Sequence, residues 1–315
     1  MKINVVVTTY NHEKYLAQCL ESILSQKGDF QMDVIIGDDA STDNTRQIAE
    51  QYQAQHPGTV FLLPPEKNLG ITKNLERCLD ACTGEYIAIC EGDDYWTDVY
   101  KLQKQKDFLD EHGDYSMCFC AFVILFEETG VLEIHPDPLY LKQDFLTTED
   151  LIERNSIGNF SCCMYRRQAV ARIPRQMYEL FFADWLFNMA CGQFGRIGFI
   201  RDWMSVYRKH AHGAWAGKSV IENNKKVIRL IDQYNEFFEY KYDTQFMKTK
   251  AALERHVVHL QANSDSDKAM SWNHSLTDRV AEQERILQNI YAGRGWRLIQ
   301  FLRRIRSWFL PSAGR

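Results

Sequence analysis

The feature that most constrains the fold is a regular alternation of two hydrophobic periods over the first hundred residues. Three segments with helical periodicity, residues 12–26, 41–56 and 69–84, separate four short apolar runs, "INVVVTTY", "MDVIIGDD", "TVFLLP" and "EYIAIC". Short strands that alternate with helices of this length are typical of βαβ units, in which the strands lie side by side and parallel. The sequence therefore predicts an α/β fold with a mainly parallel central sheet flanked by helices.

Polar residues follow three of these strands at the point where each strand ends. They are Thr8, Thr9, Tyr10 and Asn11 after the first strand, Asp38 and Asp39 after the second, and Asp93 and Asp94 after the fourth. Ligands of parallel α/β sheets bind outside the carboxyl ends of the strands. Carboxylates gathered there suit a hard divalent cation together with a phosphate-bearing substrate, whereas a lone Asp-Asp pair is more often a solvated turn. No glycine-rich dinucleotide motif or P-loop follows the first strand.

Length and composition narrow the class of protein. A chain of 315 residues allows one large domain, or one of about 200–250 residues with an appendage. The net charge of −5 gives no signal for nucleic acid. Nine cysteines without paired CxxC units predict reduced core residues of a cytosolic protein. We expect no signal peptide, since the N-terminus turns polar after a few residues, and the longest apolar run, residues 117–126, is too short to cross a bilayer.

Four segments resemble the motifs of family 2 glycosyltransferases, in the order in which that family has them. The segments are "VVVTTYNHEKYLAQCLESILSQ", "VIIGDDASTDNT", "EKNLGITKNLERCLDACTGEYIAICEGDDYW" and "YRKHAHGAWAG". The resemblance covers residues 1–218 and implies the GT-A fold, with a nucleotide-binding half over 1–98 and an acceptor half over 99–218. Residues 219–315 are expected to form a helical C-terminal region.

The resemblance implies a nucleotide-binding role for a group of matching positions: Thr8, Tyr10, Asp38, Asp39, Asn68, Gly70 and Asp93. Tyr10 matches a residue near the base, and Asp39 matches the carboxylate that hydrogen-bonds a pyrimidine. Asp93 is expected to face the ribose.

Three further positions match the metal site and the catalytic base. Asp94 is expected to bind the metal, Mn²⁺ or Mg²⁺, and His210 matches a late histidine that can join it. The tail "YRKHAHGAWAG" departs from the family's frequent "YRxHGGGxWS", so His212 is a second candidate. Asp184 matches the catalytic base, and its apolar neighbours should raise its pKa; the alternative is a helix N-cap.

Other departures and aromatic residues leave alternatives open. Gly37 and Ala40 flank the second pair of aspartates, where family members often have a bulky apolar residue and a glycine. Aromatic faces stack on sugars, so four tryptophans could line the acceptor side, although large aromatics are more often core residues: Trp96, Trp185, Trp203 and Trp215.

These features predict an inverting, metal-dependent glycosyltransferase. It would move a sugar from a UDP- or dTDP-linked donor to a hydroxyl of a lipid-linked or polysaccharide acceptor, with a metal to neutralise the leaving diphosphate and a base for the acceptor. The alternatives are a sugar nucleotidyltransferase, which would normally show a basic glycine-rich loop after the first strand, and an inactive nucleotide-sugar-binding scaffold.

The C-terminal region carries two further patterns. Leu276, Val280, Leu287 and Ile290 recur at a spacing compatible with a short coiled coil, which predicts a homodimer through residues 276–290. Residues 294–311 form a basic amphipathic pattern typical of membrane-surface helices. The alternative is a helix that docks on its own domain or on a second chain. The expected location is cytoplasmic, peripheral on the inner face of the cell membrane, with no nucleic-acid partner.

Overall fold

A single mixed sheet forms the centre of the described chain. The structure, a computed structural model, describes residues 1–64, 66–136, 141, 143–180, 184–213, 216 and 219–265. Within these residues ten strands form one sheet, in the order β3-β2-β1-β4-β9-β6-β10-β5, with β7 added beside β6 and β8 beside β10. Their bounds are β1 Lys2–Thr9, β2 Gln31–Asp38, β3 Val60–Leu62, β4 Tyr86–Ile89, β5 Tyr95–Trp96, β6 Tyr115–Phe126, β7 Leu132–His135, β8 Phe145–Leu146, β9 Cys163–Arg166 and β10 Arg196–Lys209.

The direction of the strands confirms the prediction of a mainly parallel sheet. β1 pairs in parallel with β2 and β4, β2 with β3, and β10 with β6. β9 runs antiparallel between β4 and β6, so β1–β4, β6 and β10 all point the same way. Their carboxyl ends therefore meet at one edge, where Thr9 of β1 lies opposite Asp38 of β2.

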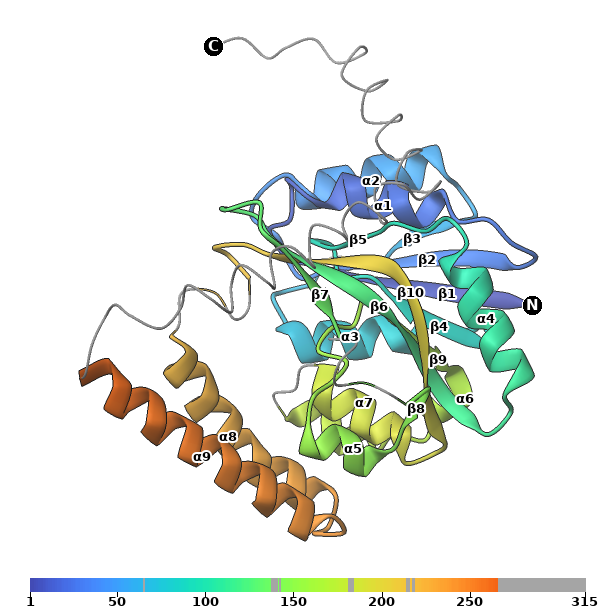
Figure 1. Ribbon diagram of the computed structural model, residues 1–315. Coiled ribbons are helices and arrows are strands. Elements are labelled where there is room, and N and C mark those ends of the chain that lie inside the picture. The colour runs from blue at the N-terminus through green and yellow to red at the C-terminus, as the bar shows by residue number, and fades with distance from the viewer. Residues whose placement is uncertain are drawn as a thin grey trace, which may run out of the picture.

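Helices cover both faces of the sheet because successive side chains of a strand point to opposite faces. Val5 and Val7 of β1 pack with the apolar sides of α1 (Leu16–Leu24), α2 (Thr45–Gln55) and α4 (Lys101–Glu111). Val6 packs on the other face, with α3 (Ile71–Asp80), α5 (Thr148–Glu153) and α7 (Asp184–Gly192). Figure 1 shows α1 and α2 on one side of the sheet and α3, α5 and α7 on the other. Two short elements lie between β9 and α7 and pack in the layer of α3, α5 and α7. They are α6 (Arg167–Val170) and the 3₁₀ helix η1 (Arg175–Glu179).

The helix after β1 begins later than the sequence pattern suggests. α1 starts at Leu16, within the segment 12–26 that has helical periodicity, and Asn11 has a φ of 56°. The Asn11 side chain accepts a hydrogen bond from the backbone N–H of Thr42, at 2.8 Å, and its own N–H donates to Ser41 Oγ at 2.9 Å. Asn11 therefore ties the loop after β1 to the loop after β2.

The two unusual residues of the second strand motif have local reasons. A Cβ at Gly37 would lie 2.2 Å from Cys78 Sγ and 2.8 Å from Asn74 Oδ1, so β2 has no room there for a side chain. Ala40 has a φ of 60°, in the left-handed region where glycine is the usual residue. The backbone of Ala40 is therefore strained where family members often have a glycine. Asp38 and Asp39 still lie at the end of β2.

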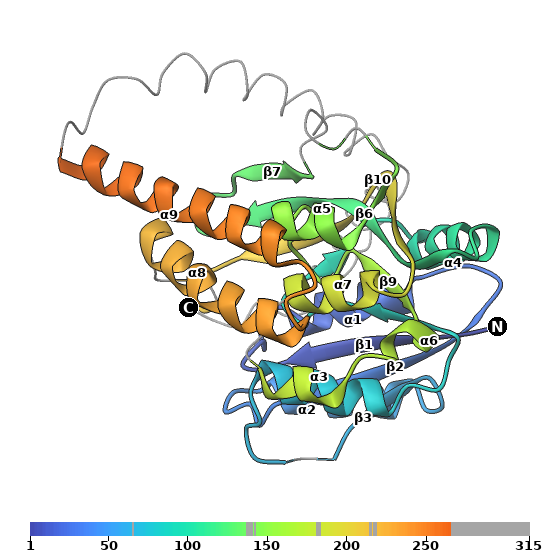
Figure 2. The same ribbon diagram turned by 90° about the horizontal axis from the view of Figure 1, so that it is seen from below.

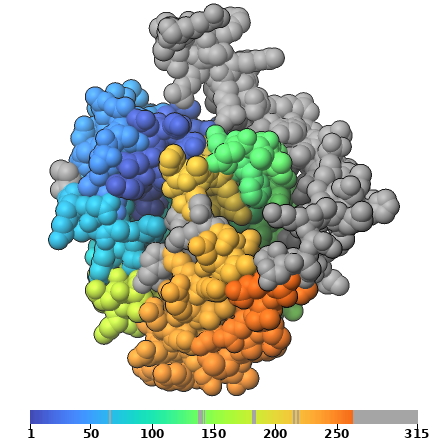
Figure 3. Space-filling view, turned by 90° about the vertical axis from the view of Figure 1, so that its left-hand side faces the viewer, coloured from blue at the N-terminus to red at the C-terminus, as the bar shows by residue number. Residues whose placement is uncertain are grey.

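Two long helices follow the last strand of the sheet and pack against the layer that contains α5 and α7. α8 (Val220–Phe237) begins with a capping box between Ser219 and Glu222 and is followed by α9 (Asp243–Asp265). Figures 2 and 3 show the two helices side by side along one flank of the molecule. Tyr234 and Phe246 are buried in the same core cluster as α5 and α7. The helical hairpin is thus packed on the α/β layers.

Three further sequence predictions concern the C-terminal residues, membrane-spanning helices and the cysteines. Residues 276–290 and 294–311, the predicted coiled coil and membrane helix, lie outside the described residues. Among the helices that are described, none has the length and apolarity that crossing a membrane requires. All nine cysteines are buried and free, which confirms them as core residues.

Candidate functional site

A pocket of about 210 Å³ opens at the carboxyl edge of the sheet, beside the ends of β1, β2 and β4. It brings together four residues that the sequence predicted for nucleotide binding: Thr8, Tyr10, Asp39 and Asp93. Its remaining lining is Thr9, His12, Ile71, Asn74, Glu91, His212 and Gly213. The pocket therefore lies where a parallel sheet collects the polar residues of its strand ends.

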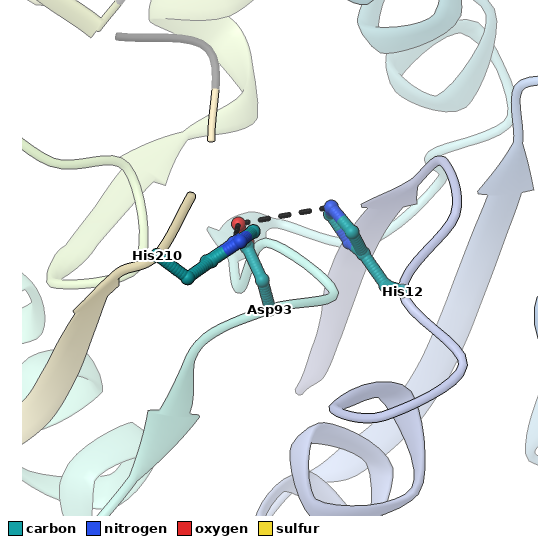
Figure 4. Close-up of side chains that lie close together, drawn as sticks. All are labelled: His12, Asp93 and His210. Carbon is teal, nitrogen blue, oxygen red and sulfur yellow. Dashed lines mark hydrogen bonds and ion pairs between the residues drawn. The ribbon is translucent and has the colours of Figure 1, made fainter. Parts of the chain in front are cut away.

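Three side chains from three different loops meet at this pocket (Figure 4). His12 follows β1, Asp93 follows β4, and His210 follows β10. His210 Nε2 lies 3.0 Å from Asp93 Oδ2, and His12 Nε2 lies 3.7 Å from the same oxygen. One ligand atom from each residue lies within 4.8 Å of the other two, so the group could hold a metal ion. We call these three residues the His-Asp-His cluster.

Electrostatics favour a charged aspartate and a neutral His12 in this cluster. Burial raises the pKa of Asp93, but the hydrogen bond to His210 and the charges of both histidines outweigh it and hold that pKa below its ordinary value. Burial lowers the pKa of His12, and the opposing attraction to Asp93 is smaller. Neutral imidazole and ionised carboxylate are the forms that bind metals.

Asp94 points away from the pocket, into the protein. Its side chain is fully buried, Oδ1 accepts from the Arg208 backbone N–H at 2.8 Å, and Oδ2 accepts from Asn159 Nδ2 at 3.0 Å and from Ser161 Oγ. Burial, with the nearby charge of Asp93, raises the pKa of Asp94 to about 7. The structure thus brings Asp93, the expected ribose contact, beside His210 and leaves Asp94, the expected metal ligand, inside the fold.

Arg208 fixes the turn that carries both aspartates. Its Nε donates to the backbone oxygen of Asp93 at 2.7 Å, and the guanidinium lies over the rings of Tyr15 and Tyr95, with its carbon 4.9 and 4.8 Å from the ring centres. The guanidinium also bonds Gln18 at 2.8 Å. Since Arg208 is only 5% exposed, these contacts make it a positioning residue for the turn.

The loop after β2 is organised by its two aspartates in different ways. Asp39 accepts from the backbone N–H groups of Leu69 and Gly70 at 2.7 and 2.9 Å, and Asn68 donates to its backbone oxygen at 2.9 Å. Asn68 and Gly70 therefore support Asp39, which lines the pocket. Asp38 is buried, accepts from Ser41 Oγ and lies 3.5 Å from Arg46, outside the pocket lining.

Asp184 lies in a second and larger pocket, of about 410 Å³. It is the first residue of α7, is half-buried, and accepts a hydrogen bond from Asn155 Nδ2 at 3.3 Å. Burial raises the pKa of Asp184 to about 6. The rest of the lining comes from β6, β7, β10, α8 and nearby loops: Phe122, Ile124, His135, Asn155, Gly158, Trp185, Tyr207, Lys209, Asn223, Val227, Leu230 and Tyr234. α8 therefore contributes to this pocket although it follows the predicted boundary at residue 218.

Glu91 links the two pockets electrostatically. It lines the first pocket, and burial, with the nearby charges of Asp94, Asp93 and Asp184, raises its pKa well above the ordinary value. Charges on the turn after β4 and on Asp184 therefore act on the same carboxyl group, that of Glu91. Sequence reasoning missed Glu91 and His12, although the spacing Glu-x-Asp and the position of His12 just after β1 were available signals.

The tryptophans divide between core and pocket. Trp185 lines the Asp184 pocket and donates from Nε1 to the backbone oxygen of Leu151 at 2.6 Å. Trp96 is fully buried and donates to Ser161 O, so it is a core residue. Trp203 is partly buried against the core, and Trp215 lies outside the described residues.

Comparisons with known proteins agree with this arrangement. The sequence profile described as "Glycosyl transferase family 2" matches residues 4–173. Protein Rv1520 of Mycobacterium tuberculosis is 36% identical over 213 residues, which are 68% of this chain and 60% of that protein. EpsE of Bacillus subtilis, named as a glycosyltransferase, is 38% identical over 130 residues, 41% of this chain and 46% of that protein.

A solved structure shares the fold and carries a ligand. S. aureus TarS, residues 1–349, in complex with UDP-GlcNAc, is 25% identical with a TM-score of 0.57, over 74% of this chain and 66% of that one. This likeness confirms the expected GT-A-type architecture. The chain spans about 60% of the length of the mycobacterial relative it matches. The profile covers more than half of the chain, so this chain belongs to glycosyl transferase family 2.

Proposed function

We propose that the chain is an inverting, metal-dependent glycosyltransferase that moves a sugar from a UDP- or dTDP-linked donor to an acceptor hydroxyl. The observation that carries the proposal is the pairing of two pockets. One holds the His-Asp-His cluster at the strand ends, and the other holds a half-buried carboxylate, Asp184, whose pKa is about 6. Glu91, which responds to charges on both sides, is the electrostatic link between them.

The donor nucleotide is assigned to the smaller pocket. Thr8 and Tyr10 offer a hydroxyl and an exposed aromatic ring, and Asp39 offers carboxylate oxygens beside them. Each carboxylate oxygen of Asp39 accepts one backbone N–H and keeps further lone pairs for the N–H of a pyrimidine. Since TarS binds UDP-GlcNAc, this compound is a rational first donor to test.

The expected metal fits the residues at the pocket. Asp93 supplies a carboxylate and His210 an imidazole, both ligand types for Mn²⁺, and the carboxylate also suits Mg²⁺. We therefore assign the metal role to Asp93 with His210, and a structural role to Asp94. When bound, the cation would neutralise the negative charge of the departing diphosphate.

Asp184 is assigned as the general base for the acceptor hydroxyl. A raised pKa makes a carboxylate a stronger base while it stays mostly ionised at pH 7. Aromatic residues Phe122, Trp185, Tyr207 and Tyr234 line its pocket, and the ring of Tyr207, which is partly exposed, could stack on a sugar. A base on one side of the donor sugar and a leaving group on the other is the arrangement that direct, inverting displacement needs. The acceptor that we propose is a hydroxyl of a lipid-linked or polysaccharide acceptor.

The test is donor turnover by the purified full chain with Mn²⁺. We expect release of UDP from UDP-GlcNAc or another UDP- or dTDP-sugar, and a transfer product of inverted anomeric configuration by proton NMR. Asp184→Asn should lower turnover by about 10²–10⁴-fold, the usual effect of losing a general base. Calorimetry should find nearly unchanged UDP binding.

The matched control is Asp107→Asn, which makes the same chemical change on the exposed surface of α4. This control should keep full turnover. If Asp184→Asn turns over donor like the control, the base assignment is incorrect. A product with retained configuration would exclude direct displacement. Formation of a nucleotide-sugar from a sugar phosphate and a nucleoside triphosphate would favour the nucleotidyltransferase alternative.

The roles proposed for the C-terminal residues rest on sequence pattern alone. We propose that residues 294–311 bind an anionic membrane surface and that residues 276–290 pair two copies of the chain. Membrane binding would bring the Asp184 pocket to a lipid-linked acceptor at a membrane face.

A further inference from the structure

His12 occupies a position in the His-Asp-His cluster for which the family resemblance assigns no role. Its Nε2 lies 3.7 Å from Asp93 Oδ2, and its ring is edge-on to that of His210, with the ring centres 6.2 Å apart. In Figure 4 the His12 and His210 side chains approach the Asp93 carboxylate from opposite sides. The two imidazoles therefore face the same carboxylate oxygen from two sides.

The loop that carries His12 is held in place by contacts outside the pocket. Asn11 bonds Ser41 and Thr42, and Glu13 accepts from the backbone and side chain of Asn44 at 3.1 and 2.8 Å. The backbone oxygen of His12 accepts from the N–H groups of Tyr15 and Leu16, both at 2.9 Å. These bonds fix the backbone on both sides of His12, so its ring is positioned in advance.

The His12 ring lacks a hydrogen-bonding reason for being where it is. Its Nδ1 is buried and has no hydrogen-bond partner within the described residues, and its Nε2 is too far from Asp93 for a good hydrogen bond. Buried polar nitrogens without partners are uncommon and costly. A cation between Nε2 and Asp93 would explain why Nε2 faces the carboxylate at 3.7 Å, although it would not itself give Nδ1 a partner.

The spacing of the three atoms suits one cation. Two ligands with bonds of about 2.1 Å lie about 3.0 Å apart at right angles and about 3.4 Å apart at the tetrahedral angle. The observed distances from Asp93 Oδ2, 3.0 Å to His210 and 3.7 Å to His12, bracket these values. All three ligand atoms lie within 4.8 Å of one another, so a side-chain movement at His12 would let one metal ion contact all three.

We propose that His12 is a third protein ligand of the metal, so that two imidazoles and one carboxylate hold the ion and select Mn²⁺ over Mg²⁺. The inference rests on the proposed metal dependence and adds a ligand and a selectivity to it. Imidazole binds first-row transition ions well, whereas Mg²⁺ prefers oxygen ligands and keeps its waters. Three protein ligands on one side leave positions open for diphosphate oxygens.

Pulsed electron paramagnetic resonance of the full chain loaded with Mn²⁺ tests the ligand directly. Nitrogen bound to Mn²⁺ modulates the spin echo, and the depth of modulation reports how many imidazoles are bound. We expect two in the wild type and one in His12→Gln. His212→Gln is the matched control, since His212 lines the same pocket but lies outside the cluster; it should keep two.

Competition gives a second measurement, independent of turnover. We expect His12→Gln to weaken Mn²⁺ binding at least about 10-fold, because losing even an outer-shell partner costs that much. Mg²⁺ affinity should change less, so less Mg²⁺ displaces Mn²⁺ from the variant. A second variant, His12→Asn, should weaken Mn²⁺ binding in the same way. Thermal melts of both variants in EDTA should show that they are folded, so that misfolding is not the cause of the weaker binding.

Each other outcome overturns the inference. One bound imidazole in the wild type, or two in both His12 variants, removes His12 from the metal, and an unchanged Mn²⁺/Mg²⁺ ratio removes the selectivity. Continued metal-dependent turnover in either case would leave the proposed function intact. Full turnover of a nucleotide-sugar in EDTA would instead refute the metal dependence itself.

Discussion

Replacing Asp94 with alanine separates a structural aspartate from a metal ligand. Asp94 is fully buried and accepts hydrogen bonds from the Arg208 backbone and from the side chains of Asn159 and Ser161. In Asp94→Ala the Arg208 N–H loses the carboxylate oxygen that accepts from it, and it cannot turn to a new partner because it is fixed by the β10 backbone. The side chains of Asn159 and Ser161 can turn, so their losses are smaller.

The size of the effect follows from these contacts. An unsatisfied buried N–H costs about 1–3 kcal/mol, and each lost bond to a charged group contributes about 1.5–3 kcal/mol. Removal of a carboxylate whose pKa is raised to about 7 by burial returns part of this, since ionising it is itself unfavourable. We expect a net loss of about 3 kcal/mol, which lowers Tm by about 6–12 °C in a domain of this size.

The matched variant is Asp93→Ala, one residue away. Asp93 is partly exposed, and its side chain contacts only the two histidines among the partners identified above. In EDTA its loss removes one hydrogen bond to a charged group, which contributes about 1.5–3 kcal/mol, whereas Asp94→Ala removes three such bonds, so Tm should fall less. It should nevertheless abolish Mn²⁺ binding, whereas Asp94→Ala should retain Mn²⁺ binding below its lowered Tm.

Thermal melts followed by circular dichroism in EDTA, with Mn²⁺ binding measured by paramagnetic resonance at 15 °C, give both readouts. EDTA matters because a ligand that binds only the folded state raises Tm by mass action. The reasoning is refuted if Asp94→Ala melts like the wild type yet binds no Mn²⁺. That result would return the metal role to Asp94.

Four further predictions concern Asp184, Ala40 and the C-terminal residues. Because the pKa of Asp184 is about 6, kcat/KM should fall about tenfold per pH unit below pH 6; a pH series should show that this limb disappears in Asp184→Asn. Raising a carboxyl pKa on folding makes ionisation destabilising as pH rises from about 4 through 6, so Asp184→Asn should raise Tm at pH 8 and leave it unchanged at pH 3. Ala40→Gly should stabilise the protein by about 0.5–1 kcal/mol in urea unfolding, since a left-handed φ strains alanine; a loss of stability would mean that glycine's extra freedom outweighs the strain. Deleting residues 294–315 should abolish sedimentation with anionic vesicles at low salt and keep Tm, whereas a large drop in Tm would mean that the segment packs on the folded domain.

The sequence by itself determined the layers of the fold and the edge at which the site lies. Alternating apolar runs and helical periods are local properties, and they predicted β1, β2, β3 and β4 with the helices between them. Since parallel strands end at the same edge, the polar residues after β1, β2 and β4 had to converge there. Motif spacing then selected Asp93, Asp184 and His210 from a chain with 42 acidic residues and nine histidines.

Only the tertiary structure decided which neighbour of each pair faces the pocket. Asp93 and Asp94 are adjacent and chemically identical, and the turn after β4 sends one to the His-Asp-His cluster and the other to Arg208, a residue 114 positions away. His12 lines the first pocket and α8 lines the second for the same reason, which is that their neighbours in the pockets are distant in sequence. The neighbours of His12 follow β4 and β10, and those of α8 include residues of α7. A local sequence pattern indicates the period of a helix or strand and roughly where it begins and ends. The direction of a side chain within a turn depends on long-range hydrogen bonds and packing, which no window of sequence contains.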